Sequence, residues 1–163
     1  MLAEGVIEPG DGSWASTPVM VKKPGGSVTY CVNYVPVNRI TKKNAYPLPD
    51  QSEQLRRLAN CRYKFKLDAW AGYWQVPIAP EDRDKAAFIT SMGLFRPISM
   101  MFGLVNAGPT FQSHMDDSFS EEIRDDVMRV YVDDISGGRN DFDQFLKDLR
   151  RVFHCALDSR RFF

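Results

Sequence analysis

Two adjacent aspartates, Asp133 and Asp134, constrain this sequence more than any other feature. They follow the apolar run Val130–Val132 and precede Ile135, so the pattern predicts two carboxylates at a tight turn between two apolar strands. Negative charges taken out of water at such a place cost free energy unless a cation neutralises them. The turn is therefore the first candidate for a cation-dependent site.

Asp68 has the same character, because it ends the alternating strand predicted over 63–67. The two remaining Asp-Asp pairs, at 116–117 and 125–126, are predicted to lie in a helical stretch and in a polar loop, where solvated carboxylates are ordinary. Three carboxylates at strand ends can converge and bind hard divalent cations such as Mg²⁺. Two such ions are the usual machinery of in-line nucleotidyl transfer.

The remaining pattern predicts an α+β chain with similar amounts of helix and strand. Strands are predicted over 19–22, 28–34, 63–67, 72–78, 86–90, 94–101 and 126–132, with a return strand from Ile135. The first two form a hairpin with a turn at 24–26. Gly137 and Gly138 are predicted to weaken the return strand, because glycine costs backbone entropy and packs nothing.

Three helices are predicted from capping residues and apolar spacing. The first is short and is capped by Asp50 or Ser52, and the second starts near Pro109. The third follows Asp141, a candidate N-cap, and carries an apolar stripe over 142–153.

Composition excludes several classes of protein. A chain of 163 residues, 44% apolar and with 21 basic and 21 acidic residues, is large enough for one core or two small lobes and is neither a polycation nor disordered. Residues 1–66 carry ten basic and five acidic side chains, so the charge is polarised along the sequence. Such a dipole suits phosphates in one lobe and cations in the other.

Cysteine and histidine usage excludes two further classes. Three cysteines without a Cys-x-x-Cys pair, and two histidines, argue against a zinc module and a disulfide framework, and favour reduced thiols in an intracellular protein. No apolar run reaches the length of a membrane span, and the N-terminus has no secretory pattern, so neither a membrane anchor nor secretion is predicted.

The segment Tyr131–Ile135 resembles the Tyr-x-Asp-Asp box of reverse transcriptases, and the chain from about residue 3 to about 157 resembles the fingers and palm of Ty3/gypsy-type retrotransposon Pol polyproteins. Six further segments carry the resemblance in the family's order and spacing: 5–9, 14–23, 46–49, 65–78, 85–88 and 101–112. One such box is a weak signal, whereas seven collinear segments are a strong one.

The resemblance implies an RNA-directed DNA polymerase that transfers dNTPs onto a primer 3′-OH with two Mg²⁺ ions, or Mn²⁺ in their place. Asp68 and Asp133 would ligate both ions and Asp134 would be a less direct ligand. Implied nucleotide contacts are Tyr73, Phe102, Gly103 and Lys23, with Tyr73 under the sugar so that a 2′-OH is excluded. Implied contacts to the RNA or DNA template-primer are Tyr131, Asn106, Gln112 and Lys22.

The resemblance also implies an architecture. Fingers would span about 1–44 and 76–106, and the palm, an antiparallel sheet packed on helices, about 45–75 and 107–163. The sequence ends at Phe163, so a thumb is expected to be absent. Expected partners are the remaining Pol domains, namely thumb, ribonuclease H and integrase, in a cytoplasmic particle or the nucleus.

Three departures from the family pattern lie in the expected fingers. Thr29, Asn33 and Val35 stand where the family usually has arginine, aspartate and arginine. Because a threonine cannot replace the charge-assisted hydrogen bonds of a guanidinium, nucleotide binding is expected to be weakened. The alternative is therefore a catalytically impaired or domesticated retroelement relic that acts as a nucleic-acid-binding or interaction module. An RNA-recognition module fails on sequence, because no Lys/Arg-Gly-Phe-x-Phe strand occurs.

Overall fold

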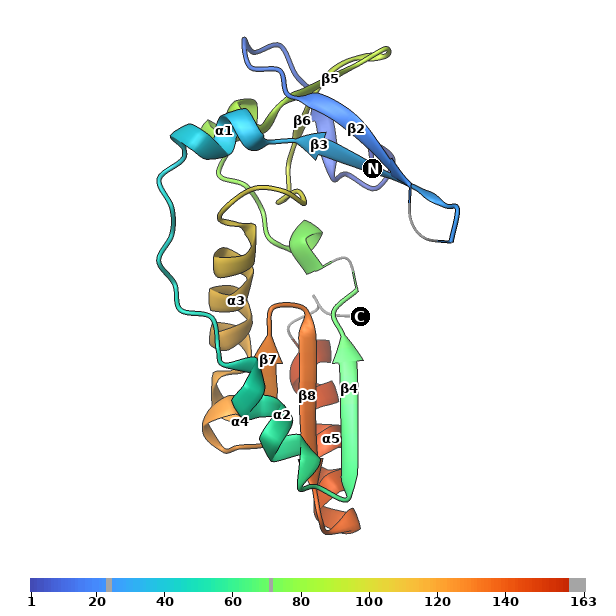
Figure 1. The fold of residues 1–163 in the computed structure, drawn as a ribbon, viewed down its shortest axis with the longest axis vertical. Coiled ribbons are helices and arrows are strands. Elements are labelled where there is room, and N and C mark those ends of the chain that lie inside the picture. Colours follow the sequence, from blue (N-terminus) through green and yellow to red (C-terminus); the bar gives the residue numbers. More distant parts are fainter. Residues whose placement is uncertain (23–24, 71, 159–163) are drawn as a thin grey trace. The chain divides into compact units, whose positions relative to one another are not determined.

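The protein is described by a computed structural model that covers residues 1–22, 25–70 and 72–158, and the chain divides into two compact units. Unit 1 consists of Met1–Lys43 and Tyr73–Ala107, and unit 2 of Asn44–Gly72 and Gly108–Phe163. The chain therefore passes from one unit to the other three times. Figure 1 shows the elements of both.

Unit 1 is built from two antiparallel sheets. The first has the strand order β1-β6-β5, and the second is the hairpin β2-β3. Their bounds are β1 (Ile7–Pro9), β2 (Thr17–Lys22), β3 (Val28–Asn33), β5 (Phe88–Thr90) and β6 (Gly93–Pro97). A short helix, α1 (Val35–Ile40), follows the hairpin directly, and a 3-10 helix, η2 (Pro80–Ala86), precedes β5. The predicted hairpin is confirmed, because β2 and β3 pair in antiparallel register from Thr17 and Asn33 to Lys22 and Val28.

Tyr34 lies at the centre of the unit 1 core. It is 1% exposed and belongs to a cluster of buried residues: Val6, Ile7, Val32, Ala86, Phe88 and Met101. The Tyr34 hydroxyl donates a hydrogen bond to the carbonyl of Ala86 at 2.9 Å, which satisfies the one polar group of a buried ring. Burial raises the pKa of Tyr34 well above its ordinary value, and neighbouring Tyr30 adds to the rise.

Unit 2 is a three-stranded antiparallel sheet with helices. Its strand order is β4-β8-β7, with β4 (Tyr63–Asp68), β7 (Arg129–Tyr131) and β8 (Asp134–Arg139). The helices are α2 (Gln51–Ala59), α3 (Ala107–Ser118), α4 (Ser120–Arg124) and α5 (Phe142–Asp158). Figure 1 shows α5 running along the sheet, and its Phe142 and Phe145 lie against Tyr63, with ring centroids 5.1 and 6.0 Å away.

The two faces of this sheet have different roles. Side chains alternate along β4, so Tyr63 and Phe65 face α5 while Lys66 and Asp68 point to the opposite, solvated face. An antiparallel sheet with one covered face and one wet face leaves room for a polar site. The α+β fold with an antiparallel sheet packed on helices is confirmed.

The return strand forms in full as β8, although Gly137 and Gly138 were predicted to weaken it. β8 continues through Gly137 and Gly138 and pairs with β4 along its whole length. A Cβ atom on Gly137 would lie 2.5 Å from the Phe65 ring, and one on Gly138 would lie 2.9 Å from Cβ of Cys61. These two glycines therefore let other groups pack directly against the strand.

Other element boundaries also differ from the predictions. The strand predicted over 72–78 is wrong, because this stretch begins with a 3-10 helix, η1 (Gly72–Gln75), and forms only an isolated bridge at Pro77. Gly72 lies against the Phe111 ring, where a Cβ atom would be 3.0 Å away, and proline lacks an N–H for a ladder. The strands predicted over 86–90, 94–101 and 126–132 are shorter than expected, and β1, α1, η2 and α4 were not anticipated.

Both predicted N-caps, by contrast, are confirmed. The Asp50 carboxylate accepts from the amide of Ser52 at 2.8 Å, and that of Asp141 accepts from Gln144 at 2.8 Å. Cys31, Cys61 and Cys155 form no disulfide bond in the described part of the chain. In the described ranges, no helix is long and apolar enough to cross a membrane.

The charge polarisation along the sequence becomes mild when it is assigned to the folded units. Unit 1 carries eight basic and six acidic residues, and unit 2 thirteen and fifteen. The reason is that residues 44–66, which are rich in arginine and lysine, belong to the unit that also holds most of the aspartates. The charges that matter for a site are therefore local ones.

Candidate catalytic site

The turn between β7 and β8 has only two residues, Val132 and Asp133. Tyr131 pairs with Asp134 across it, which makes a two-residue hairpin loop. Val132 has a φ of 53°, a left-handed conformation that is costly for a β-branched residue and occurs where surrounding structure enforces it. The predicted pair of carboxylates at a tight turn is confirmed, and the turn is strained.

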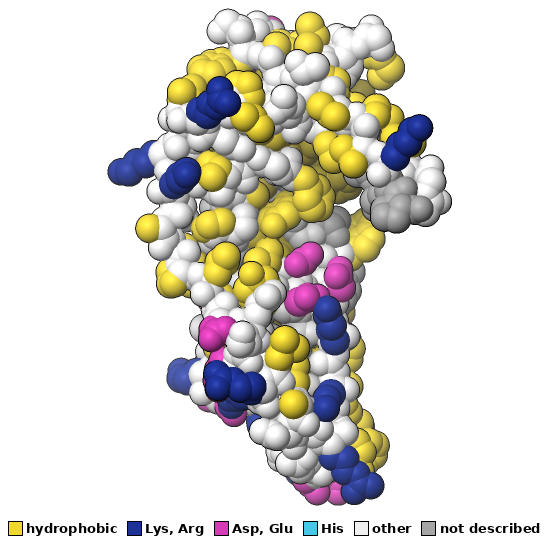
Figure 2. All heavy atoms as spheres, in the orientation of Figure 1, with side chains coloured by type: hydrophobic (Ala, Val, Ile, Leu, Met, Phe, Trp, Pro, Cys, Tyr) yellow, Lys and Arg dark blue, Asp and Glu magenta, His cyan; other side chains and the backbone are white. Residues whose placement is uncertain are grey.

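The register of the sheet brings Asp68 to this turn. Asp68 is the direct partner of Asp134 across β4 and β8, and the amide of Ala69 donates to the carbonyl of Asp133 at 2.9 Å. All three aspartates therefore lie at one end of one sheet. Figure 2 shows acidic side chains gathered over this end of β4 and β8, beside a basic side chain.

Lys66 is the cation nearest to these carboxylates. Its Nζ lies 2.9 Å from Oδ1 of Asp134, and its side chain is 68% exposed. The hydrogen bond and charge of Asp134 raise the pKa of Lys66, and the charges of Asp68 and Asp133 raise it further. All three carboxylates therefore act on one ammonium group, although an ion pair this exposed contributes little to stability.

The chemistry of these donors fits a hard divalent cation, because carboxylate oxygens are the ligands that Mg²⁺ prefers. Among residues 1–22, 25–70 and 72–158, however, no three or more His, Cys, Asp and Glu side chains already form a group that could hold a metal ion. Asp134 is engaged with Lys66 instead. The residues fit by type and by position, and their side chains would have to reorient to share an ion.

Gln112 of α3 contacts the turn between β7 and β8. Its side chain is completely buried, its Oε1 accepts from the amide of Val132 at 2.7 Å, and its Nε2 donates to Asp116 at 2.9 Å. A buried side chain does not contact a template directly, so this position favours a supporting role over the template contact that the resemblance implied. Tyr131, also expected at the template-primer, is half-buried at the end of β7.

Three expected nucleotide-binding residues lie together in unit 1. The rings of Tyr73 and Phe102 meet edge to face, with centroids 4.9 Å apart, and Phe102 is 57% exposed. Gly103 is the next residue and has a φ of 94°, a backbone conformation that residues other than glycine rarely adopt. Its carbonyl accepts from Nδ2 of Asn38 at 2.7 Å, and Asn38 also accepts from the amide of Val105.

The residues that depart from the family pattern lie on or next to the β2-β3 hairpin. Val35 is 54% exposed at the start of α1, and Oδ1 of Asn33 accepts from its amide at 3.1 Å. Lys22, an expected template contact, is exposed at the end of β2. Lys23, an expected nucleotide contact, and the side chain of Thr29 lie outside the described part of the chain.

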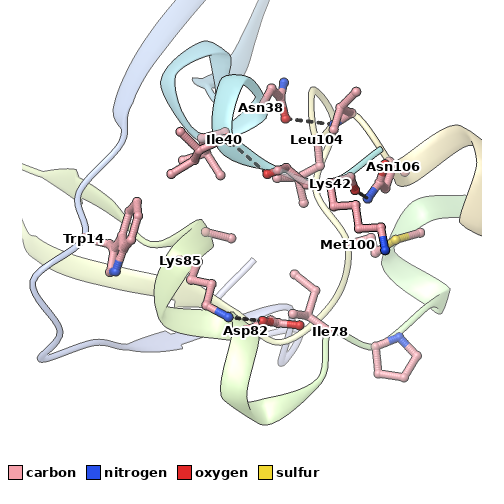
Figure 3. Close-up of a pocket in the computed structure, with 16 residues that line it drawn as sticks. Trp14, Asn38, Ile40, Lys42, Ile78, Asp82, Lys85, Met100, Leu104 and Asn106 are labelled. Carbon is pink, nitrogen blue, oxygen red and sulfur yellow. Dashed lines mark hydrogen bonds and ion pairs between the residues drawn. The ribbon is translucent and has the colours of Figure 1, made fainter. Parts of the chain in front are cut away.

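A cavity of about 670 Å³ occurs within unit 1. Trp14, Lys42 and Asn106 contribute to its lining, together with apolar residues of α1 and of the segment before α3. Figure 3 shows these three side chains coming from separate segments around the cavity. Nδ2 of Asn106 donates to the carbonyl of Lys42 at 2.9 Å, which joins two sides of the cavity at the residue expected to support the template.

Two residues that contact expected site residues, Lys66 in unit 2 and Asn38 in unit 1, were not singled out from the sequence. Lys66 could have been found, because it lies two residues before Asp68 in an alternating strand and so shares its face. Asn38 gave no local signal, since its partners Gly103 and Val105 are far along the chain.

Comparison with known proteins gives a family match over most of the chain. Residues 21–160 match the family described as reverse transcriptase (RNA-dependent DNA polymerase). The chain is 34% identical to the retrovirus-related Pol polyprotein from transposon opus of Drosophila melanogaster over 93% of its length, but it spans only 16% of that polyprotein. An RNA-directed DNA polymerase homolog of Oenothera berteroana is 38% identical over 67% of this chain and 76% of its own length.

Solved structures give the same result for the fold. The foamy viral protease-reverse transcriptase in complex with an RNA/DNA hybrid superposes with a TM-score of 0.85, covering 96% of this chain and 21% of that one at 23% identity. This likeness establishes the fold of the chain.

Proposed function

Because this chain belongs to the family of reverse transcriptases (RNA-dependent DNA polymerases), we propose that it catalyses RNA-directed DNA synthesis by adding dNTPs to a primer 3′-OH. The observation that carries the proposal is the meeting of Asp68, Asp133 and Asp134 at one end of one sheet. The chain is a reverse transcriptase domain of the kind found in retroelement Pol polyproteins.

Asp68 and Asp133 would hold the catalytic divalent ions, and Asp134 would act less directly. The chemistry that two bound ions supply there is a lowered pKa of the primer 3′-OH and neutralisation of the leaving pyrophosphate. The strained turn carries Asp133 at the end of the sheet, and the hydrogen bond from the amide of Ala69 to the backbone carbonyl of Asp133 supports a position of this turn beside Asp68. Lys66 balances the charge of Asp134.

Unit 1 would act as the fingers and unit 2 as the palm. Tyr73 would lie under the sugar of the incoming dNTP and select against a 2′-OH, while Phe102 and Gly103 would line the nucleotide pocket. Lys22 and Lys23 would face phosphates. The contact between Tyr73 and Phe102 and the anchoring of Gly103 by Asn38 support one preformed nucleotide wall.

The template would pass Tyr131 and Asn106, with Trp14 and Lys42 of the unit 1 cavity available for a base and a phosphate. The solved relative bound to an RNA/DNA hybrid supports this class of partner. Since the chain spans a small part of the opus polyprotein, other Pol domains would act beside it, in a cytoplasmic particle or the nucleus.

Primer extension on an RNA template tests the proposal. The purified chain, with dNTPs and Mg²⁺, is expected to extend the primer, and the double substitution Asp133→Asn, Asp134→Asn is expected to abolish extension. Asp143→Asn on α5 serves as the matched control, since it removes one exposed carboxylate outside the site. A folded wild-type chain that extends nothing would overturn the proposal in favour of a nucleic-acid-binding or interaction module.

A further inference from the structure

We propose that Tyr46 and Asp116 are positioning residues that fix the catalytic turn through Gln112, an inference that rests on the proposed function. The Tyr46 hydroxyl donates to Oδ2 of Asp116 at 2.7 Å, and Nε2 of Gln112 donates to Oδ1 of the same carboxylate at 2.9 Å. The amide of Val132 then donates to Oε1 of Gln112 at 2.7 Å. These bonds form a continuous relay from the start of unit 2 to the turn.

The Asp116 carboxylate determines the orientation of the side-chain amide of Gln112. A carboxylate only accepts hydrogen bonds, so it selects the NH₂ end of Gln112. Oε1 must then face Val132, whose amide needs an acceptor. The reversed amide would set oxygen against carboxylate and NH₂ against N–H, which is unfavourable at both ends. The orientation is therefore dictated from outside the turn, by a residue one helical turn further along α3.

Tyr46 in turn holds the carboxylate. Its bond to one oxygen leaves the other for Gln112, and Asp116 thereby accepts from two side chains at once. The hydrogen bond to Asp116 raises the pKa of Tyr46, so the proton remains on the hydroxyl and is donated. Asp117 adds a smaller rise, and the hydrogen bond with Ser113 acts against it.

The left-handed conformation of Val132 explains why the turn requires support from its surroundings. A β-branched residue in the left-handed conformation is strained and persists only where its surroundings enforce it, and Val132, which has this conformation, directly precedes Asp133. The carbonyl of Val130 is held on the other side of Val132 by Gln54 at 3.1 Å and more weakly by Gln112 at 3.4 Å. Because Gln112 is fully buried, each of its bonds is stronger than it would be in water.

Kinetics and amide exchange of two single variants test the relay. Tyr46→Phe removes one hydroxyl and is expected to lower the kcat of primer extension about two- to tenfold with the KM for dNTP unchanged. Asp116→Asn, whose amide no longer selects the orientation of Gln112, is expected to lower kcat more. Both are expected to speed hydrogen exchange of the Val132 amide. The matched control is Tyr63→Phe in the same unit, where the ring packs on α5. It is expected to change neither kcat nor the hydrogen exchange of the Val132 amide.

A double-mutant cycle makes the test specific. If Tyr46 acts through Gln112, the effects of Tyr46→Phe and Gln112→Met on kcat are less than additive. Additive effects, or lowered thermal stability of Tyr46→Phe with kcat and Val132 exchange unchanged, would overturn the relay and leave a purely structural bond. The exchange measurement needs no activity, so a wild-type chain that extends no primer contradicts the proposed function while exchange still decides the relay.

Discussion

The two units of this chain differ in how their expected functional residues are specified. In unit 2 the three aspartates reach one place through strand register and a two-residue turn, which are properties of the backbone. In unit 1 nucleotide binding is expected to depend on individual side chains, among them those at Thr29, Asn33 and Val35, the three positions expected to depart from the family pattern. We therefore expect substitutions in unit 1 to change nucleotide binding without disturbing the backbone geometry of unit 2.

The comparison predicts that chemistry and nucleotide affinity can be changed independently. Losses in unit 2 should appear in kcat, because under the proposed function its carboxylates would act on the reacting atoms. Changes in unit 1 should appear in the KM for dNTP. A unit 2 variant that changes mainly the KM for dNTP, or a unit 1 variant that changes mainly kcat, would contradict this difference between the units.

The largest effect is expected in unit 2. Asp68→Asn should lower kcat about 10³-fold or more, because a neutral amide replaces a carboxylate that would hold a catalytic ion, and such an ion supplies several kcal/mol of transition-state stabilisation. Single-turnover primer extension measures this. A loss below tenfold would remove Asp68 from the site, and Asp143→Asn reports the background.

The next effect is expected in unit 1. Thr29→Arg together with Val35→Arg should tighten dNTP binding roughly a hundredfold, since two guanidinium groups restore charge-assisted hydrogen bonds to phosphate. The measurement is the KM for dNTP, with kcat unchanged. Thr29→Gln with Val35→Gln is the matched control without charge. Unchanged affinity would mean that the pocket has diverged at further positions.

A glycine-to-alanine substitution is expected to lower stability more in unit 2 than in unit 1. Gly137→Ala in unit 2 should lower the free energy of unfolding by about 1–3 kcal/mol, because its Cβ would lie 2.5 Å from the Phe65 ring. Gly10→Ala in unit 1 should change stability far less, since its nearest neighbours are 3.6 Å away. Urea denaturation compares the two, and equal losses would contradict the close packing against β8.

The smallest effect is a pH dependence that originates in unit 1. Burial raises the pKa of Tyr34, so its contribution to stability is fully present below the unfolded tyrosine pKa of about 10 and is lost as pH rises above it. The expected slope is at most about 1.4 kcal/mol per pH unit. Urea midpoints between pH 9 and 11 should fall less steeply in Tyr34→Phe than in wild type, whereas Tyr63→Phe in unit 2 should follow wild type.

Sequence patterns predicted the parts of the fold that local rules determine. The alternation of β4, the β2-β3 hairpin and the caps Asp50 and Asp141 each depend on residues within a few positions. The convergence of Asp68 with Asp134 was also predictable, because each ends or begins a strand beside the other in an antiparallel pair.

The sequence could not predict features that depend on distant partners. The stretch after Gly72 coils as η1 where Gly72 meets the Phe111 ring, and β1 exists only because it pairs with β6. The contacts of Gln112 could not be predicted for the same reason. Its position on α3 indicates neither its hydrogen bond with the amide of Val132 nor the hydrogen bond from Tyr46 to Asp116.

The interleaving of the two units also has a consequence for synthesis on the ribosome. All residues of unit 1 have emerged once Ala107 has done so, whereas β4 ends at Asp68 and its partner β8 begins only at Asp134. Domains fold as units during elongation, and non-local strand pairs close late. The nascent chain should therefore carry an unpaired β4 while unit 1 is already folded, and the three aspartates should meet only after β8 has left the exit tunnel.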